Sequence, residues 1–404
     1  MTMTDYKCSI VAQTGKKQKI KYSAESKAEV IDYLKKNRFN IIKIKESGKI
    51  WTCINKVSVK KINSKDLAVF SKQIYVMLRA GITIADSLEI LMQQTENKKF
   101  ALIIEHMYEA LQKGNTLSET LFNYKKYFPD IFISMAKAGE LSGNIDIIMD
   151  RMSVHFEKEY KIENKIKSAM IYPSILAVVC VTVVMFLLTT IMPTFIEMYS
   201  SSRVPLPAIT ATLINMSNVL KQYWYIFLVI IFFIAFAVSM LRKNQKVKYK
   251  ECYYKLKFPI VKNLSIKIST SRFTRTLSTL IGSGVSLLQA LDTAARVTGN
   301  TYIENKIIEA KEDVQRGMAL SQSLKHHGIF PPMVYSMIKV GEDSGSIEEI
   351  LDKTADFYDE EVDAAVQQLT TIIEPIMIVI MAIIIGFIVI AMVNPMFDMV
   401  NTVK

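Results

Sequence analysis

The chain has 404 residues, half of them apolar, and a formal net charge of +12. Its mean hydropathy of +0.22 is high for a protein that is soluble throughout, and its length predicts several domains. The four cysteines, Cys8, Cys53, Cys180 and Cys252, are far apart and show neither a CxxC spacing nor a disulfide framework. The composition therefore excludes a small disulfide-bonded scaffold, and we expect no bound metal or cofactor.

Residues 1–50 have the pattern of a small α+β module. Alternating segments at 6–13, 19–23 and 39–46 predict short strands, and residues 23–37 predict a helix. No apolar segment typical of a signal peptide precedes them, so we expect the N-terminus to lie in the cytoplasm.

The N-terminal region is strongly basic. Residues 1–63, which include a predicted linker at 51–63, hold fifteen basic and five acidic side chains. Such a surface suits an acidic partner or the anionic cytoplasmic leaflet of a membrane. A solvated surface without a specific partner is an equally good interpretation. A nucleic acid is not expected, because membrane spans follow in the same chain.

Residues 64–168 predict a first bundle of about six helices. Between Asp66 and Ala80, apolar residues recur at spacings of three and four, as they do on one face of a helix. Ser64 is the predicted N-cap of this helix and Gly81 its predicted C-terminal stop. A long helix from about residue 144 to residue 167 is expected to run from the bundle toward the membrane.

Three apolar runs are long enough to cross a bilayer, namely 171–192, 224–241 and 372–393. The first and third have 22 residues each, which at 1.5 Å per residue span about 33 Å. The third run carries one charge, Glu374, near its start. Such runs are rare in soluble proteins, so we predict three transmembrane helices.

The distribution of Lys and Arg orients these spans. Eleven basic residues lie between Arg242 and Arg275, against two between residues 193 and 223. Basic flanks stay in the cytoplasm, so the first span leaves the cytoplasm, the second returns and the third leaves by alternation. The remaining predicted segments are an external loop at 193–223, a basic cytoplasmic linker at 242–269 and a short external tail at 394–404.

One large segment occurs twice. "KAGELSGNIDIIMD" at Lys137 recurs as "KVGEDSGSIEEILD" at Lys339, and nine of 23 positions are identical between 137–159 and 339–361. Chance would give roughly one or two identities. Other landmarks keep an offset of 202 or 203 residues. Residues 270–370 are therefore predicted to form a second bundle that repeats the first.

The doubled segment holds the candidate site residues. They are glycines and glutamates at a predicted tight turn, namely Gly139, Glu140, Gly143, Gly341, Glu342 and Gly345. The glycines are expected where backbones approach closely or where φ is positive. Two interpretations of the glutamates stay open: contacts to a partner or an ion, or carboxylates that cap a nearby helix N-terminus.

These motifs resemble the platform proteins of type IV pili and type II secretion machines, the pilus C and secretion F proteins. The resemblance covers nearly the whole chain and includes the doubled segments "LRAGITIADSLEIL" and "LIGSGVSLLQALDTA". It also includes residues at the starts and ends of spans, namely Tyr172, Pro173, Pro193, Glu374, Pro375 and Pro395. It implies a mainly α-helical protein of the inner membrane, with two homologous six-helix cytoplasmic bundles, three transmembrane helices and a small N-terminal α+β module.

The resemblance also implies a role in fibre assembly. Proteins of this family couple a cytoplasmic hexameric ATPase to the extraction and polymerisation of pilins or pseudopilins. These proteins, other membrane components of the machine, further copies of this chain and membrane lipid are the expected partners. The sequence has no Walker A motif, so the chain is not expected to be an enzyme. A membrane transporter or permease-like protein is the alternative, and the choice between a pilus, a secretion pseudopilus and a competence fibre stays open.

Overall fold

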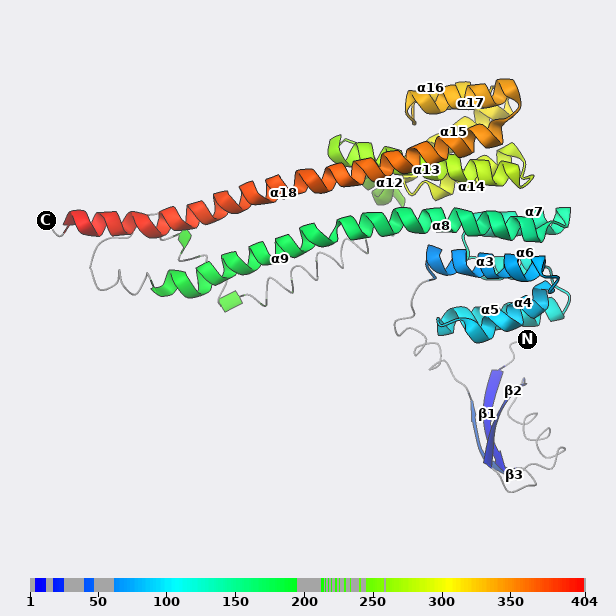
Figure 1. Cartoon of the computed structure of the whole chain (residues 1–404). Coiled ribbons are helices and arrows are strands. Elements are labelled where there is room, and N and C mark those ends of the chain that lie inside the picture. Colours follow the sequence, from blue (N-terminus) through cyan, green and yellow to red (C-terminus); the bar gives the residue numbers. More distant parts are fainter. Residues whose placement is uncertain are drawn as a thin grey trace. The chain divides into compact units, whose positions relative to one another are not determined.

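The computed structural model describes the backbone of residues 4–11, 17–24, 40–46, 62–194, 245–257 and 259–402, and isolated positions between 212 and 240. The chain divides into two compact units (Figure 1). One unit comprises residues 1–62 with 95–102, and the other comprises residues 63–94 with 103–404.

In the first unit, three antiparallel strands form a sheet in the order β2-β1-β3. The strands are β1 (Thr4–Val11), β2 (Lys17–Ala24) and β3 (Asn40–Glu46). They fall on the three segments whose alternation predicts strands. The helix predicted at 23–37 and most of the linker predicted at 51–63 lie outside the described residues.

The first repeat consists of six helices, namely α3 (Ser64–Arg79), α4 (Ile84–Gln94), α5 (Lys98–Gln112), α6 (Leu117–Asn123), α7 (Asp130–Ser142) and α8 (Ile145–Ala169). Asn63 is the N-cap of α3, and its backbone N–H donates to Asp66 Oδ2 at 3.1 Å. The predicted cap, Ser64, is instead the first helical residue. Gly81 follows α3 with a φ of 85°, which agrees with the predicted stop.

The second repeat has six helices in the same order, namely α13 (Pro259–Gly282), α14 (Leu287–Val297), α15 (Thr301–Gln315), α16 (Leu320–His327), α17 (Pro332–Ser344) and α18 (Ile347–Thr402). Their starts keep the sequence offset from α4 onward, so the duplication extends to the helix boundaries. α12 (Gln245–Lys255) and the first turns of α13 occupy much of the segment at 242–269 that the sequence predicts as a linker.

The landmarks of the repeat are core residues. In the first repeat Phe70 and Phe128 are buried, with ring centroids 6.2 Å apart. Their counterparts Phe273 and Phe330 stack with centroids 4.7 Å apart. The same aromatic contact therefore holds the first helix of each repeat to the turn before its fifth helix.

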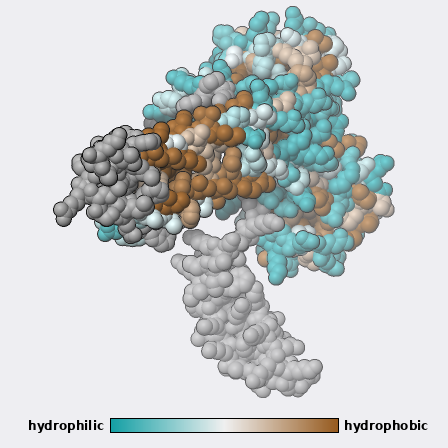
Figure 2. Space-filling view, turned by 60° about the vertical axis from the view of Figure 1, so that its left-hand side comes forward, coloured by the Kyte–Doolittle hydropathy of each residue, from teal (hydrophilic) through white to brown (hydrophobic). Residues whose placement is uncertain are grey.

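Each repeat continues into an apolar helix. After Met170, α8 passes into α9 (Ile171–Phe186) and the π-helical turn η1 (Leu187–Ile191), and α18 is one helix of 56 residues. Both stretches contain an 18-residue window with a mean hydropathy of 2.8 or 3.3, and only 17% of each window is buried. Figure 2 shows hydrophobic side chains gathered over these helices, whereas hydrophilic side chains cover most of the visible bundle surface.

So large an exposed apolar surface suits lipid. Among the described residues, two helices are thus long and apolar enough to span a membrane, and they match the first and third predicted spans. The second predicted span, at 224–241, is described only at isolated positions.

The two apolar helices contact each other near their far ends. Leu188 and Met192 pack in one cluster with Ile388 and Ala391. In the π-helical turn, the Leu188 carbonyl accepts a hydrogen bond from Ser217 Oγ at 2.5 Å. A π turn frees backbone groups, and a hydroxyl partner satisfies one of them in apolar surroundings.

Candidate functional site

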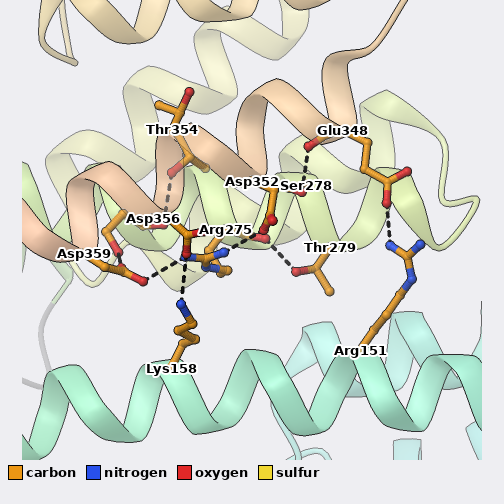
Figure 3. A network of polar contacts seen from close by, with 12 residues as sticks. Arg151, Lys158, Arg275, Ser278, Thr279, Glu348, Asp352, Thr354, Asp356 and Asp359 are labelled. Carbon is orange, nitrogen blue, oxygen red and sulfur yellow. Dashed lines mark hydrogen bonds and ion pairs between the residues drawn. The ribbon is translucent and has the colours of Figure 1, made fainter.

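The repeats meet along a polar seam between α8 of the first repeat and α13 and α18 of the second (Figure 3). At its centre, Arg275 on α13 binds three carboxylates of α18. Its guanidinium nitrogens lie 2.6 Å from Asp352, 2.6 Å from Asp356 and 2.8 Å from Asp359. These acids are three and four residues apart, which places them on one face of the helix. The Arg275 side chain is only 9% exposed, so its charge is balanced inside the protein.

A ladder of three ion pairs crosses the seam from α8 to α18, and its pairs are Arg151–Glu348, Lys158–Asp356 and Lys165–Asp363. The first two pairs are 2.7 Å and 2.9 Å long. The three bases are seven residues apart, so they follow one face of α8 over about four turns. Burial alone would raise the pKa of Asp356, but hydrogen bonds from Lys158 and Arg275 lower it below its usual value. The ladder fixes the register of one repeat against the other.

A second, more buried pair joins α8 to α13. Arg272 Nε donates to Glu159 Oε2 at 3.2 Å, and the two side chains are 20% and 16% exposed. Burial raises the pKa of Glu159, and the charge of Arg272 opposes that rise. Farther along, Ile162 packs against Val362 and Val366. The seam therefore keeps charged pairs as far as Lys165–Asp363 and also holds an apolar cluster near the spans.

A groove of about 620 Å³ opens where α18 begins, with Arg151, His155 and Arg275 among its lining residues. His155 is 5% exposed, and its Nδ1 has no hydrogen-bond partner in the described part of the chain. Burial, together with the charges of Arg275 and Arg272, lowers the pKa of His155 to about 4. The imidazole is therefore neutral near pH 7. Across the described residues, no group of three His, Cys, Asp or Glu side chains could hold a metal.

The sequence predicts that the candidate glycines bracket a tight turn, but the structure shows that they do not. Gly139 and Gly341 are buried inside α7 and α17. A Cβ would lie 2.9 Å from Ile148 Cγ1 at Gly139 and 2.9 Å from Ile347 Cα at Gly341, so both permit a close approach of consecutive helices. Gly143 and Gly345 end α7 and α17, each with a φ of 72° in the left-handed region. The predicted turn position is wrong for the first glycine of each pair, whereas the close approach of a neighbouring helix agrees with the expectation for these glycines.

The candidate glutamates cap the fourth helix of each repeat. Glu140 accepts hydrogen bonds from the N–H groups of Leu117 and Ser118, the second at 3.1 Å. Glu342 accepts them from the counterparts of these residues, the Leu320 N–H at 2.6 Å and the Ser321 N–H at 3.2 Å. A carboxylate satisfies the free N–H groups and the positive end of a helix dipole. The structure favours the capping interpretation, and contact with a partner stays a prediction.

The residues at the span starts lie together. Tyr172 Oη donates to Glu374 Oε1 at 3.1 Å, and these two residues are counterparts 202 positions apart. Pro173 lies in the first turn of α9, and Pro375 lies within α18. At the other ends, the backbone is helical on both sides of Pro193, and α18 continues through Pro395 to Thr402. Cys180 and Cys252 are free and buried.

The Arg275 network was missed in the sequence. Its signal is the spacing of the acids along α18, but a charged helix face is usually solvated and carries no mark of a distant partner. The tight pairing of α8 with α18 could not be inferred from either copy alone.

The fold is that of a membrane-anchored helical protein in which two equivalent bundles share a charged seam and each leads into an apolar helix. The family model "Type II secretion system (T2SS), protein F" matches residues 70–193 and again residues 273–395. The chain therefore belongs to this family, and the two matches confirm the predicted duplication.

Several curated proteins are similar over most of the chain. The type IV pilus assembly protein PilC of Thermus thermophilus is 39% identical over 84% of this chain and 84% of its own length. PilC of Pseudomonas aeruginosa is 32% identical over 92% of this chain and 98% of its length. The type II secretion system protein F of Aeromonas hydrophila is 31% identical over 85% of this chain and 88% of its own length. Membership of this inner-membrane platform family supports the prediction that the chain is not an enzyme.

Proposed function

We propose that the chain is the inner-membrane platform of a type IV pilus or a related fibre-assembly machine. It couples a cytoplasmic hexameric ATPase to the extraction of pilins or pseudopilins from the membrane and to their polymerisation. The similarity to pilus assembly proteins of two organisms, at 39% and 32% identity, favours the pilus. Other membrane components of the machine and further copies of this chain are its remaining partners.

The continuity of each bundle with a span supports this function most directly. α18 runs 56 residues from the seam through the apolar segment, and only Met170 separates α8 from α9. An α-helix rises 1.5 Å per residue, and long helices curve only gently except at kinks such as those at prolines. A displacement that the ATPase imposes on the bundles therefore reaches the membrane along these helices.

A test is to soften α18 between the bundle and the span. Gln367, Gln368 and Thr371 are exposed there, so their replacement removes no packing. Glycine at all three positions costs about 1 kcal/mol per residue of helix stability relative to alanine. We expect the triple glycine variant to accumulate in the membrane but to form few fibres, and the matched triple alanine variant to form them normally. Normal fibres from the glycine variant would contradict transmission along α18.

The proposed topology places the N-terminus and both bundles in the cytoplasm and residues 394–404 outside. The charge asymmetry around the predicted loops supports it. A cysteine at position 201 should react with an impermeant maleimide in intact cells, and one at position 246 should not. Reaction at 246 would reject the three-span arrangement. The purified chain should bind the assembly ATPase and hydrolyse no nucleotide itself.

A further inference from the structure

We propose that the exposed face of α3 and α8 in the first repeat binds the outward face of α18 in a second copy of this chain. Each side of the seam has a counterpart on the other repeat, because the fold is duplicated. In the described part of the single chain these two counterpart faces do not contact another repeat. Their residues differ from those of the seam, and the changes on one face complement the changes on the other. The inference goes beyond the platform role and uses only the expectation that copies of the chain associate.

The free face of the first repeat is a version of the seam face of the second. Lys72 occupies the place of Arg275, and its Nζ lies 2.8 Å from Asp150 Oδ1, as Arg275 lies near Asp352. Tyr75 and Glu157 lie near Lys72, and three exposed valines lie on the same face as this retained pair. Val69, Val76 and Val154 stand where the second repeat has Arg272, Thr279 and Asp356. They are 47%, 54% and 45% exposed.

The outward face of α18 is likewise a version of the seam face of α8. Lys353, Phe357 and Glu360 are the counterparts of Arg151, His155 and Lys158. All three are exposed, and Phe357 is 40% exposed. An aromatic residue therefore faces outward at the position where the seam buries a neutral histidine.

The changes on the two free faces complement one another. In the seam, His155 lies beside Arg272 and Arg275. If two copies meet with the same geometry, Phe357 of one copy contacts the counterparts of these arginines in the other, namely Val69 and the aliphatic part of Lys72. Single exposed apolar residues are common on proteins. Here, however, they fall at facing positions of one interface, where their joint burial is favourable.

Oppositely charged residues also meet in the proposed contact. The seam places Asp356 between two bases, Lys158 and Arg275. In the proposed contact Val154 takes the place of Asp356. Glu360 and Lys72 take the places of the two bases, and their opposite charges attract each other directly. At the end of the ladder, Lys353 faces Asp146 as Arg151 faces Glu348. Complementary charges of this kind select the partner and its register.

The contact is compatible with a membrane. α8 and α18 lead into their spans in the same direction, and a contact with the geometry of the seam keeps all spans of both copies parallel. It joins different surfaces of the two copies, so it is head-to-tail and can close into a ring of repeats.

Cross-linking between two tagged copies tests the proposal. The native cysteines are replaced, one copy carries Val76→Cys and the other Phe357→Cys, and membranes are treated with a short bis-maleimide. We expect a product that contains both tags. The matched control replaces Val76→Cys with Val340→Cys, a residue of similar exposure (48%) on α17, and should give no such product. Absence of the mixed product, or a dominant product between two Val76→Cys copies, would overturn the proposal.

A charge exchange gives a second measurement. Lys72→Glu should reduce the cross-linked product several-fold, and adding Glu360→Lys should restore it, while either variant still accumulates in the membrane. Failure of the second change to restore the product would contradict the pairing. Since neither measurement uses fibre assembly, a negative result would leave the proposed platform function untouched.

Discussion

The pair Lys72–Asp150 in the first repeat and the pair Arg275–Asp352 in the second occupy the same place in the fold but not the same environment. The Lys72 side chain is 55% exposed and that of Arg275 is 9% exposed. An exposed pair contributes about 0–1 kcal/mol, whereas breaking a buried pair costs about 3–5 kcal/mol. The same ion pair is thus a minor surface contact in the first repeat and a buried, stabilising contact in the second. The reason is that α8 of the first repeat packs over the pair in the second repeat, whereas neither repeat, as far as the structure describes them, packs over the pair in the first.

The largest expected effect comes from removing Arg275, and removing Lys72 is the matched comparison. Arg275→Met leaves Asp359, a side chain only 16% exposed, without its cation and should destabilise the protein by about 3 kcal/mol. Lys72→Met should change the stability by less than about 1 kcal/mol. Thermal unfolding in detergent measures both. Adding Asp359→Leu to Arg275→Met should recover part of the loss; equal effects of the two single variants would show that burial does not set the difference.

The next effect uses the position where one repeat has His155 and the other Phe357. The pKa of His155 is about 4 in the fold, below the ordinary value near 6.5, so the unfolded chain binds the proton first as the pH falls. This contribution to stability is complete above pH 6.5 and is lost toward pH 4, by about 3 kcal/mol at most.

His155→Phe, which copies the residue of the second repeat, should remove that pH dependence. Unfolding midpoints of both proteins between pH 4.5 and 7.5 measure it. The wild-type midpoint should fall more steeply with acid than that of the variant. Parallel curves would show that His155 is solvated or already paired.

The parts of the fold that the sequence predicted are those with local signals. Glycines with positive φ, such as Gly81, mark helix ends, and charge-free runs mark the spans. The duplication added power, because each motif is present twice. The turn position predicted for Gly139 was wrong because a glycine inside a helix and one in a turn look alike until the packing of Ile148 is known. Arg275 was missed because its partners lie 77 to 84 residues away.

The close helix contact at Gly139 in the first repeat differs from that at Gly341 in the second. This difference predicts unequal effects of Gly139→Ala and Gly341→Ala. The nearest atom to the new Cβ is a side-chain atom of Ile148 at Gly139 but the backbone Cα of Ile347 at Gly341. A side chain can rotate, whereas backbone must shift. We expect losses of about 1 kcal/mol and up to about 3 kcal/mol, respectively, in unfolding experiments. Gly386→Ala is the control, since nothing lies within 4 Å of its Cβ, and a loss there would point to a general effect of alanine.

The smallest effect concerns the two capping glutamates, whose helices are not equally well capped without them. Thr116 caps α6, and its Oγ1 accepts a hydrogen bond from the Glu119 N–H at 3.2 Å. The N-cap of α16 is Ala319, which offers no side-chain acceptor, and Glu342 also accepts a hydrogen bond from the Ser321 hydroxyl. Losing a cap costs about 0.5–2 kcal/mol. Glu342→Ala should therefore fall near the upper end of this range and Glu140→Ala near the lower end.

The same variants separate capping from contact with a partner. If Glu140 only caps α6, fibre assembly by Glu140→Ala should follow its small loss of stability, and Glu140→Gln, which keeps one acceptor oxygen, should assemble normally. If Glu140 also contacts the ATPase or a pilin, Glu140→Gln should lose assembly at unchanged thermal stability. Because α6 keeps Thr116 as its cap, Glu140 can be changed with little risk to the fold, and the first repeat is where a partner role is most clearly tested.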